Sequence, residues 1–401
     1  MRKVIYFLLT LSFIFSTFVT VFSQEVKPEK VRRIVYEIKP NEWYKQQAKL
    51  WKKEIEKDPQ NAGAWHNYYN AVRYEDYVNT ISTKEKQEKL RKIVENLEKN
   101  APESFECYYL KYFNSRDKTK NISLIEKAQQ IDPSRPDVYY ELITHNEIKG
   151  NEKQVTYYYQ QLYKTKDISP QLVNYNYNVL MSTEENAILF TNGDNDTYPA
   201  RMLQEAKGIR KDVLIINIPM SGVESFLKRK LKSKNIKIDC KKLMKNSISV
   251  DANQNKAFSI STFVQELSKQ LAEKHPEYPI YFASTVYQNH YATLKDDLYS
   301  AGLAFLYSKE RIDNIALIKK NFEKNYRLDG LNFHWYGENE PINSFMKKIN
   351  MNYVAPIIML AEHYKTSGQP EKIVSWKNLA IKIGKQAGNE DVIKYFEDKG
   401  M

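Results

Sequence analysis

Apolar residues in the first half of the chain recur at helical spacing. From Asn41 to about Lys166 the pattern is typical of paired amphipathic helices, and turns that contain proline interrupt it at intervals of 43, 31 and 37 residues. A proline after a polar or small residue suits the first turn of a helix. A period scattered about the mid-thirties is typical of solenoids built from helical hairpins. We therefore predict helical repeats over residues 41–185, with turns at Pro59, Pro102, Pro133 and Pro170.

Small and aromatic residues recur after these turns, at Ala64, Trp65, Tyr68, Tyr69, Tyr139, Tyr140, Leu142, Gly150, Tyr157, Tyr158 and Leu162. With this set the stretch resembles tetratricopeptide repeats. The repeats are degenerate, because Val155 stands where the second helix usually has alanine and because the interval varies. The resemblance implies a concave groove, lined by the inner helices, that takes a protein or peptide. The tyrosine pairs either pack between helices or contribute to this groove, and the pattern leaves both roles open.

From Asn186 to about Lys309 the pattern changes to short apolar runs separated by helical stretches. This change is typical of an α/β domain. We predict a small α/β domain with a mostly parallel sheet over residues 186–310, and a polar surface loop from Ser247 to Lys256. The expected strands are Ala187–Phe190, Val213–Ile218, Ile236–Ile238, Pro279–Ala283 and Leu303–Tyr307.

Helical spacing returns in residues 311–401. An apolar stripe begins at Ile357 and continues at the third, fourth and seventh following positions, while Gly368 suits a helix end and Pro370 a helix start. The predicted fold class is therefore a helical-hairpin solenoid, then a small α/β domain with a mostly parallel sheet, then a C-terminal helical hairpin.

The loop Thr191–Pro199 holds the densest group of acidic and turn-forming residues in the chain. It follows a predicted strand, and α/β domains bind ligands at the carboxyl ends of their strands. Two carboxylates one residue apart can share a divalent cation. Acidic residues at a helix N-terminus also cap the helix without any ligand, and this structural alternative stays open. The candidate ligand-binding residues are Asn192, Asp194, Asn195, Asp196, Thr197 and His290, and the candidate metal ligands are Asp194 and Asp196.

Complete catalytic and cofactor motifs are absent from the sequence. It contains no G-x-S-x-G, G-x-x-x-x-G-K-[ST], H-E-x-x-H or G-x-G-x-x-G pattern. The acidic loop does not fit the Asp-x-Asp-x-Thr of haloacid-dehalogenase-type phosphoryl transferases, because Thr197 comes one residue early. We assign no catalytic residue, and no cofactor beyond a divalent cation at the acidic loop.

The first residues predict export. Arg2 and Lys3 precede a mostly apolar stretch, Val4–Phe22, which is the pattern of a signal peptide with cleavage after Ser23. An uncleaved membrane anchor is the alternative, since the stretch approaches the length that spans a bilayer. We expect a signal peptide over residues 1–23, a linker over 24–40, no membrane span after cleavage, and a secreted or periplasmic protein.

The charge of the chain is basic but diffuse. The net charge of +12 becomes +10 without residues 1–23, and lysines are spread through nearly every helical stretch. A basic run such as Lys228–Lys234 is usually the solvated face of a helix, so we expect no nucleic-acid partner. Two cysteines, Cys107 and Cys240, are too few for a disulfide framework.

A second family resemblance rests on Asn192–Pro199, Leu203–Glu205, Gly208–Arg210, Asp212–Ile218, Pro279–Thr285 and Gly302–Phe305. The region from Asn186 to Ser308 is similar to the soluble C-terminal region of bacterial protein O-mannosyltransferase-like multispanning membrane proteins. The membrane-embedded part that carries the catalytic acid and binds lipid-linked sugar in that family has no counterpart in this sequence. The resemblance therefore implies recognition of an acceptor or partner rather than catalysis.

These patterns favour a binding protein over an enzyme. We predict an exported protein-binding or scaffold protein of the cell envelope, with a protein or peptide partner in the repeat groove. The alternative is a metal-dependent glycosyl- or phosphoryl-transfer enzyme, or an accessory subunit of a glycosylation system, that uses Asp194 and Asp196.

Overall fold

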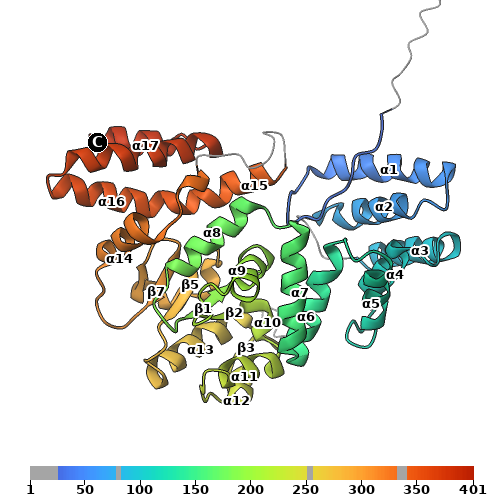
Figure 1. The fold of residues 1–401 in the computed structure, drawn as a ribbon, viewed down its shortest axis with the longest axis horizontal. Helices are drawn as coiled ribbons and strands as arrows, with labels where there is room; N and C mark the ends of the chain where they lie inside the picture. The colour runs from blue at the N-terminus through green and yellow to red at the C-terminus, as the bar shows by residue number, and fades with distance from the viewer. Residues whose placement is uncertain (1–25, 78–82, 251–255, 332–340) are drawn as a thin grey trace, which may run out of the picture.

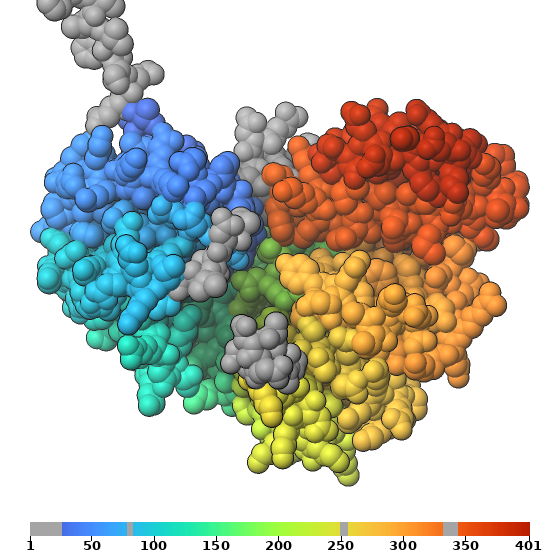
Figure 2. Space-filling view, turned by 180° about the vertical axis from the view of Figure 1, so that it is seen from behind, coloured from blue at the N-terminus to red at the C-terminus, as the bar shows by residue number. Residues whose placement is uncertain are grey.

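The computed structural model describes residues 26–77, 83–250, 256–331 and 341–401 (Figure 1). The predicted signal peptide, residues 1–23, lies outside the described residues. Among the residues that are described, no helix is both long and apolar enough to cross a membrane. The N-terminal helices and the C-terminal helices lie at opposite sides of the molecule, and the α/β domain lies between them (Figure 2).

Antiparallel helices stack along the N-terminal half and confirm the predicted helical-repeat architecture. From α1 to α7 each helix packs against the next, whereas α7 and α8 both pack against α9 of the α/β domain. The helices are α1 (Asn41–Lys57), α2 (Ala62–Tyr74), α3 (Lys84–Asn100), α4 (Phe105–Asn114), α5 (Ile122–Ile131), α6 (Asp137–Lys149), α7 (Glu152–Thr165) and α8 (Pro170–Met181).

Each proline turn comes just before an even-numbered helix. Three of these helices begin with a side-chain cap, in which an oxygen accepts a hydrogen bond from a backbone N–H of the first turn and so satisfies a donor that the helix leaves free. The caps are Asn61 before α2, Ser104 before α4 and Ser169 before α8. Three of the four helices that follow a proline turn, α2, α4 and α6, contribute side chains to the inner face of the repeats.

The central sheet is mixed. Its order is β2-β1-β5-β7-β6, in which β1 pairs in parallel with β2 and β5, while β7 pairs antiparallel with β5 and β6. The prediction of a mostly parallel sheet is therefore correct for β2, β1 and β5, and wrong for β7 and β6. The strands are β1 (Ile188–Thr191), β2 (Leu214–Asn217), β5 (Ile280–Ala283), β6 (Leu298–Ser300) and β7 (Ala304–Tyr307).

Helices surround this sheet. Helices α9 and α11 pack against β2, α13 packs against β5, and α14 packs against β6. Residues of β1, β2 and β5 are buried without exception, as expected for strands covered on both faces. The helices are α9 (Asp194–Lys207), α10 (Ile218–Ser221), α11 (Glu224–Lys232), α12 (Cys240–Asn246), α13 (Ile260–Lys274) and α14 (Asn314–Lys320).

Two local predictions in the α/β domain are wrong. The apolar run Ile236–Ile238 is not a strand but the connection between α11 and α12. The expected surface loop instead contains the strand β3 (Ile248–Val250), which pairs antiparallel with β4 (Lys256–Phe258) as a separate two-stranded sheet. In the first case an apolar run of three residues does not distinguish a strand from a buried connection. In the second, strands of three residues in a polar stretch are too short to give an apolar signal.

The C-terminal region contains the predicted hairpin. Gly368, in the left-handed conformation, comes just after α16, and Pro370 opens α17, which packs against α16. Cys107 and Cys240 are both buried and free. The helices are α15 (Pro341–Asn350), α16 (Val354–Thr366), α17 (Pro370–Ala387) and α18 (Asp391–Asp398).

A buried ionic cluster joins the repeats to the α/β domain. The Glu147 carboxylate on α6 lies 3.3 Å from Arg201 Nε on α9 and 3.5 Å from Lys230 Nζ on α11. Arg229 donates to the backbone oxygens of Glu147 and Ile148 at the end of α6. The expectation of a solvated basic run is therefore wrong for Arg229 and Lys230, since both dock onto α6.

Candidate functional site

The acidic loop forms the first turn of α9, which begins at Asp194. The Asp196 carboxylate accepts from the backbone N–H groups of Asn192 (2.6 Å) and Gly193 (2.8 Å) and from Thr285 Oγ1 (2.6 Å). Its residue is 2% exposed. Burial raises the pKa of the Asp196 carboxyl, and these hydrogen bonds oppose the rise. Asp196 thus caps α9 and ties the loop to the end of β5.

Thr197 also bonds inward. Its hydroxyl lies 2.7 Å from Thr191 Oγ1 at the end of β1 and accepts from Asn217 Nδ2 at the end of β2 (2.9 Å). The three residues are buried. Thr197 therefore joins the carboxyl ends of two neighbouring strands.

Pro199 lies inside α9 and lacks the N–H that would bond to the carbonyl of Asn195. That carbonyl accepts instead from Asn176 Nδ2 of α8 at 2.9 Å. A side chain from the neighbouring helix thus replaces the missing backbone bond, which explains why the helix continues through a proline.

Asp194 and Asn195 turn the other way, toward the N-terminal segment. The Asp194 carboxylate lies 3.6 Å from the Arg33 guanidinium, and its side chain is 46% exposed. Asn195 Nδ2 donates to the backbone oxygen of Val35 at 3.1 Å. The two acidic residues proposed as metal ligands therefore differ in surroundings: Asp196 is enclosed by donors, and Asp194 is open to solvent.

His290 is held by a different part of the domain. Its Nδ1 lies 3.0 Å from Ser261 Oγ on α13, and burial lowers the pKa of its imidazole. Its hydrogen bonds within the described chain do not include a residue of the acidic loop. No group of three or more His, Cys, Asp or Glu suited to a metal ion occurs among the described residues. Cation binding by Asp194 and Asp196 stays a prediction.

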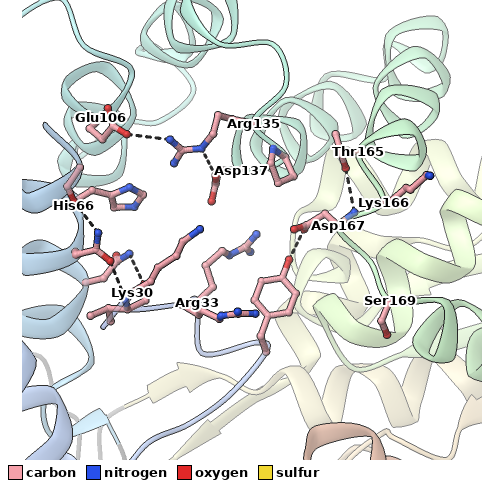
Figure 3. A pocket seen from close by; sticks show the side chains of 17 residues that line it. Lys30, Arg33, His66, Glu106, Arg135, Asp137, Thr165, Lys166, Asp167 and Ser169 are labelled. Carbon is pink, nitrogen blue, oxygen red and sulfur yellow. Dashed lines mark hydrogen bonds and ion pairs between the residues drawn. The ribbon is translucent and has the colours of Figure 1, made fainter. Parts of the chain in front are cut away.

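A larger candidate site lies on the inner face of the repeats. There the segment of residues 30–36 and helices α2, α4 and α6, together with the α7–α8 connection, enclose a cavity of about 660 Å³ (Figure 3). Lys30 and Arg33 extend from the segment into this space, opposite Arg135 and Asp137 (Figure 3). The volume falls in the range of known ligand sites.

Part of the charge in this cavity is internally paired. Arg135 bonds to Glu106 (3.0 Å) and to Asp137 (3.2 Å). His66 is partly buried and its pKa is lowered, mainly by desolvation, so that its ring is neutral near pH 7. The ion pairs of Arg135 connect α4 to the start of α6. On the side of α2, the cavity is lined by the neutral groups of His66, Asn67 and Asn70.

Asp167, in the α7–α8 connection, accepts hydrogen bonds from two tyrosines. Tyr140 donates at 2.6 Å, and Tyr36 of the segment also donates to the same carboxylate. Burial raises the pKa of both phenols, and the nearby Asp167 raises it further, so both stay protonated donors at neutral pH. Asp167 therefore anchors the segment to the far side of the cavity.

A narrow crevice continues from this cavity to the acidic loop. It shares Arg33, Tyr36 and Ser169 with the cavity and ends against Asp194 and Asn195. The structure thus places two of the six predicted site residues, Asp194 and Asn195, in the wall of this crevice. The other four lie in the hydrogen-bond networks of the α/β domain.

Sequence reasoning missed the residues that line the cavity, such as His66, Asn67 and Asp167. Two signals were available. The helices that follow the first three proline turns supply the inner face, so polar residues in their first two turns were candidates. The second signal was the basic stretch before Asn41. Its position in the groove, however, depends on contacts with residues far along the chain, which the sequence does not reveal.

Comparison with known proteins supports part of the family resemblance. The family model described as TMEM260-associated domain 2 matches residues 172–242, which run from α8 into α12. TMEM260 is an O-mannosyltransferase-like membrane protein, so the predicted resemblance is confirmed at this level within that stretch. Its extension to Ser308 stays a prediction. A search of curated proteins found no match.

Solved structures give only a remote likeness. The chain is similar to yeast Tom70, with 12% identity over 89% of this chain and 59% of that one and a TM-score of 0.26. It is also similar to a monomeric mutant of IFIT1 with m7Gppp-AAAA, with 11% identity over 85% of this chain and 68% of that one and a TM-score of 0.28. The chain thus spans 59% of the Tom70 chain that it matches. Likeness at these TM-scores carries no argument about function.

Proposed function

We propose that the chain is a protein- or peptide-binding scaffold, and that the cavity on the inner face of its helical repeats takes an extended segment of a partner. The supporting observation is the open polar cavity of about 660 Å³ between α2, α4, α6 and the α7–α8 connection. Helical-repeat proteins use such concave faces for recognition. Side-chain amides of α2, Asn67 and Asn70, are suited to a peptide backbone, since in the structure they bond to the backbone of Val31 of this chain.

A cavity-filling substitution tests this proposal. Gly63 lies at the cavity in the first turn of α2, and a Cβ there would meet only Asn61 Oδ1, at 3.4 Å. Gly63→Phe therefore adds a ring at the cavity wall, and its Cβ meets no backbone atom. We expect peptides selected from a random dodecapeptide library on the wild-type chain to bind this variant at least about tenfold more weakly. Fluorescence anisotropy measures the affinities.

The matched control places the same ring on the outer surface. Lys89 is exposed on α3 and is not part of the cavity. Lys89→Phe should leave the affinity of the selected peptides unchanged, and both variants should keep the thermal midpoint of the wild type. Selected peptides that bind Gly63→Phe as tightly as the wild type would place the interaction elsewhere and refute the proposal.

A role in a glycosylation system is the second candidate. One observation favours it, the match of residues 172–242 to TMEM260-associated domain 2. The same stretch contains the acidic loop and α9, which meets the crevice at the end of the cavity. In this role the chain would present a glycosylation partner or acceptor, or hold a nucleotide sugar through a cation at Asp194.

A further inference from the structure

The segment of residues 26–40, predicted as a linker, lies against the repeats before α1 begins, without helix or strand and with a turn at residues 34–36. The backbone N–H of Tyr36 donates to the backbone oxygen of Arg33 (3.0 Å) and closes this turn. At Glu29 of this segment, two side chains of α1 bind the backbone. The backbone N–H of Glu29 donates to Gln47 Oε1 (2.7 Å), and its backbone oxygen accepts from Trp51 Nε1 (2.8 Å). Both main-chain groups of this residue are thus satisfied by side chains, in the way a bound peptide is.

The same arrangement recurs two residues later on α2. The backbone N–H of Val31 donates to Asn67 Oδ1 (2.8 Å), and its backbone oxygen accepts from Asn70 Nδ2 (3.4 Å). The spacing of two residues is that of an extended strand, whose alternate residues face one side. These hydrogen bonds involve only backbone groups of residues 29 and 31, so they do not depend on the side chains of the bound segment. The side chain of Val31 adds an apolar contact, because its residue is 2% exposed.

Further along, two side chains of the segment reach the opposite wall. The Arg33 guanidinium lies over the Tyr140 ring, 4.5 Å from its centroid, and faces Asp194. Tyr36 donates to Asp167. The segment therefore crosses the groove and is fixed at both sides by groups that belong to the repeats or to α9.

Charge complementarity identifies the kind of peptide that fits. Between residues 27 and 33 the segment carries four basic side chains and one acidic side chain. Asp167 and Asp194, at the wall that the segment reaches, are acidic. A basic peptide therefore complements the charge of this surface.

We infer that the surface formed by α1, α2, Tyr140, Asp167 and Asp194 binds a basic peptide of a partner protein, and that residues 27–36 are an intramolecular occupant which the partner displaces. The bound peptide lies along α1 and α2 and turns between its arginine and its aromatic residue, as residues 33–36 do. The recognised pattern is an apolar residue, arginine two positions later and an aromatic residue three positions after that. The inference rests on the proposed function and names its ligand class. A tethered occupant has an effective concentration near the millimolar range for a short linker, and therefore weakens a competing peptide.

The test compares two full-length variants of matched composition. Val31→Ala with Arg33→Ala removes two anchors of the segment, while Val26→Ala with Lys27→Ala removes an exposed valine and a lysine before the first anchor. The probe is a fluorescein-labelled peptide with the sequence of residues 26–38. We expect the first variant to bind the probe at least about tenfold more tightly than the wild type, whereas the second binds as the wild type does.

The groove side is tested in the loosened background. Adding Asn67→Ala and Asn70→Ala to the first variant should weaken probe binding at least about tenfold, because the backbone acceptor and donor are lost. Thermal melts monitored by circular dichroism confirm that each variant folds. A probe with alanine at the positions of Val31 and Arg33 should bind about tenfold more weakly than the native probe.

Three results would overturn the inference. Equal probe affinity of the wild type and the loosened variant would show that the segment is not a competitor. A folded, loosened variant that dimerises in sedimentation without taking up the probe would make a second copy the occupant. Library peptides that are blocked by Gly63→Phe but not displaced by the probe would leave the proposed function intact and refute this ligand class alone.

Discussion

The acidic loop after β1 and the cavity of the repeats are both rich in polar side chains, yet they differ in what those side chains face. In the loop, Asp196 and Thr197 are buried and bonded to neighbouring strands. In the cavity, side chains from several helices surround an open volume of about 660 Å³. Part of a dense polar motif can thus serve as a structural joint, as Asp196 and Thr197 do, whereas a binding surface requires polar groups that a ligand can reach.

The largest expected effect separates the two aspartates of the loop. Asp196→Ala leaves the N–H groups of Asn192 and Gly193 and the hydroxyl of Thr285 without their acceptor. We expect a loss of about 3 kcal/mol in the free energy of unfolding. Asp194→Ala should change it by less than about 1 kcal/mol, since its partly exposed ion pair is long. Urea unfolding measures both, and equal losses would contradict the assignment of Asp196 as the joint.

A smaller effect concerns pH at the cavity. The pKa of His66 lies below its usual value of 6.5, because burial disfavours the charged ring; Arg135 and Lys30 act in the same direction, and Glu106 and Asp137 oppose it. Below pH 6.5 the unfolded chain therefore binds more protons than the folded chain, and stability falls as the pH drops from 6.5 toward the folded-state pKa. One such group contributes at most about 1.4 kcal/mol per pH unit.

His66→Asn should remove this part of the pH dependence. Urea unfolding at a series of pH values from 7.5 to 5 measures the slope for the wild type and the variant. Other titrating groups contribute equally to both proteins, so the difference between the two slopes reports on His66. Parallel slopes would show that His66 has an ordinary pKa and that the cavity is better hydrated than the structure indicates.

The smallest expected effect concerns the cation. Asp196 already accepts three hydrogen bonds, so Asp194 is the carboxylate of the pair that remains open. We expect calorimetry with Mn²⁺, alone and with a nucleotide sugar, to show no heat that differs between the wild type and Asp194→Ala. Saturable binding that is lost in this variant would instead favour the glycosylation role and make the loop a functional site.

Much of the architecture could be predicted from local patterns. Proline turns such as Pro59 and Pro170 precede capped helices because proline and the cap residue act within one turn of the chain. Four of the five expected strands exist because a run of buried apolar residues is itself the signal. The antiparallel half of the sheet was missed, since strand direction depends on connections rather than on hydrophobicity.

The candidate site could be predicted only in part. Asp194 and Asp196 look equivalent in the sequence, but one turns into the sheet and the other toward Arg33, which is far away along the chain. Lys230 appeared to belong to a solvated run, but it is buried, because it pairs with Glu147 on a helix far away along the chain. Tyr140 was one of a pair with two open roles, and it is both buried and in contact with the segment. Pairings between distant residues decide these outcomes.

Helix α9 has a consequence for the number of repeats. It packs against both α7 and α8, where the first helix of another repeat would stack, and it also covers β2 of the sheet. A solenoid ordinarily grows by inserting a hairpin between neighbours or at its end. Here an added hairpin after α8 would have to displace α9 from the sheet and break the contacts of Arg201 with Glu147. The array is therefore closed at this end, and its length is set by the domain that follows it.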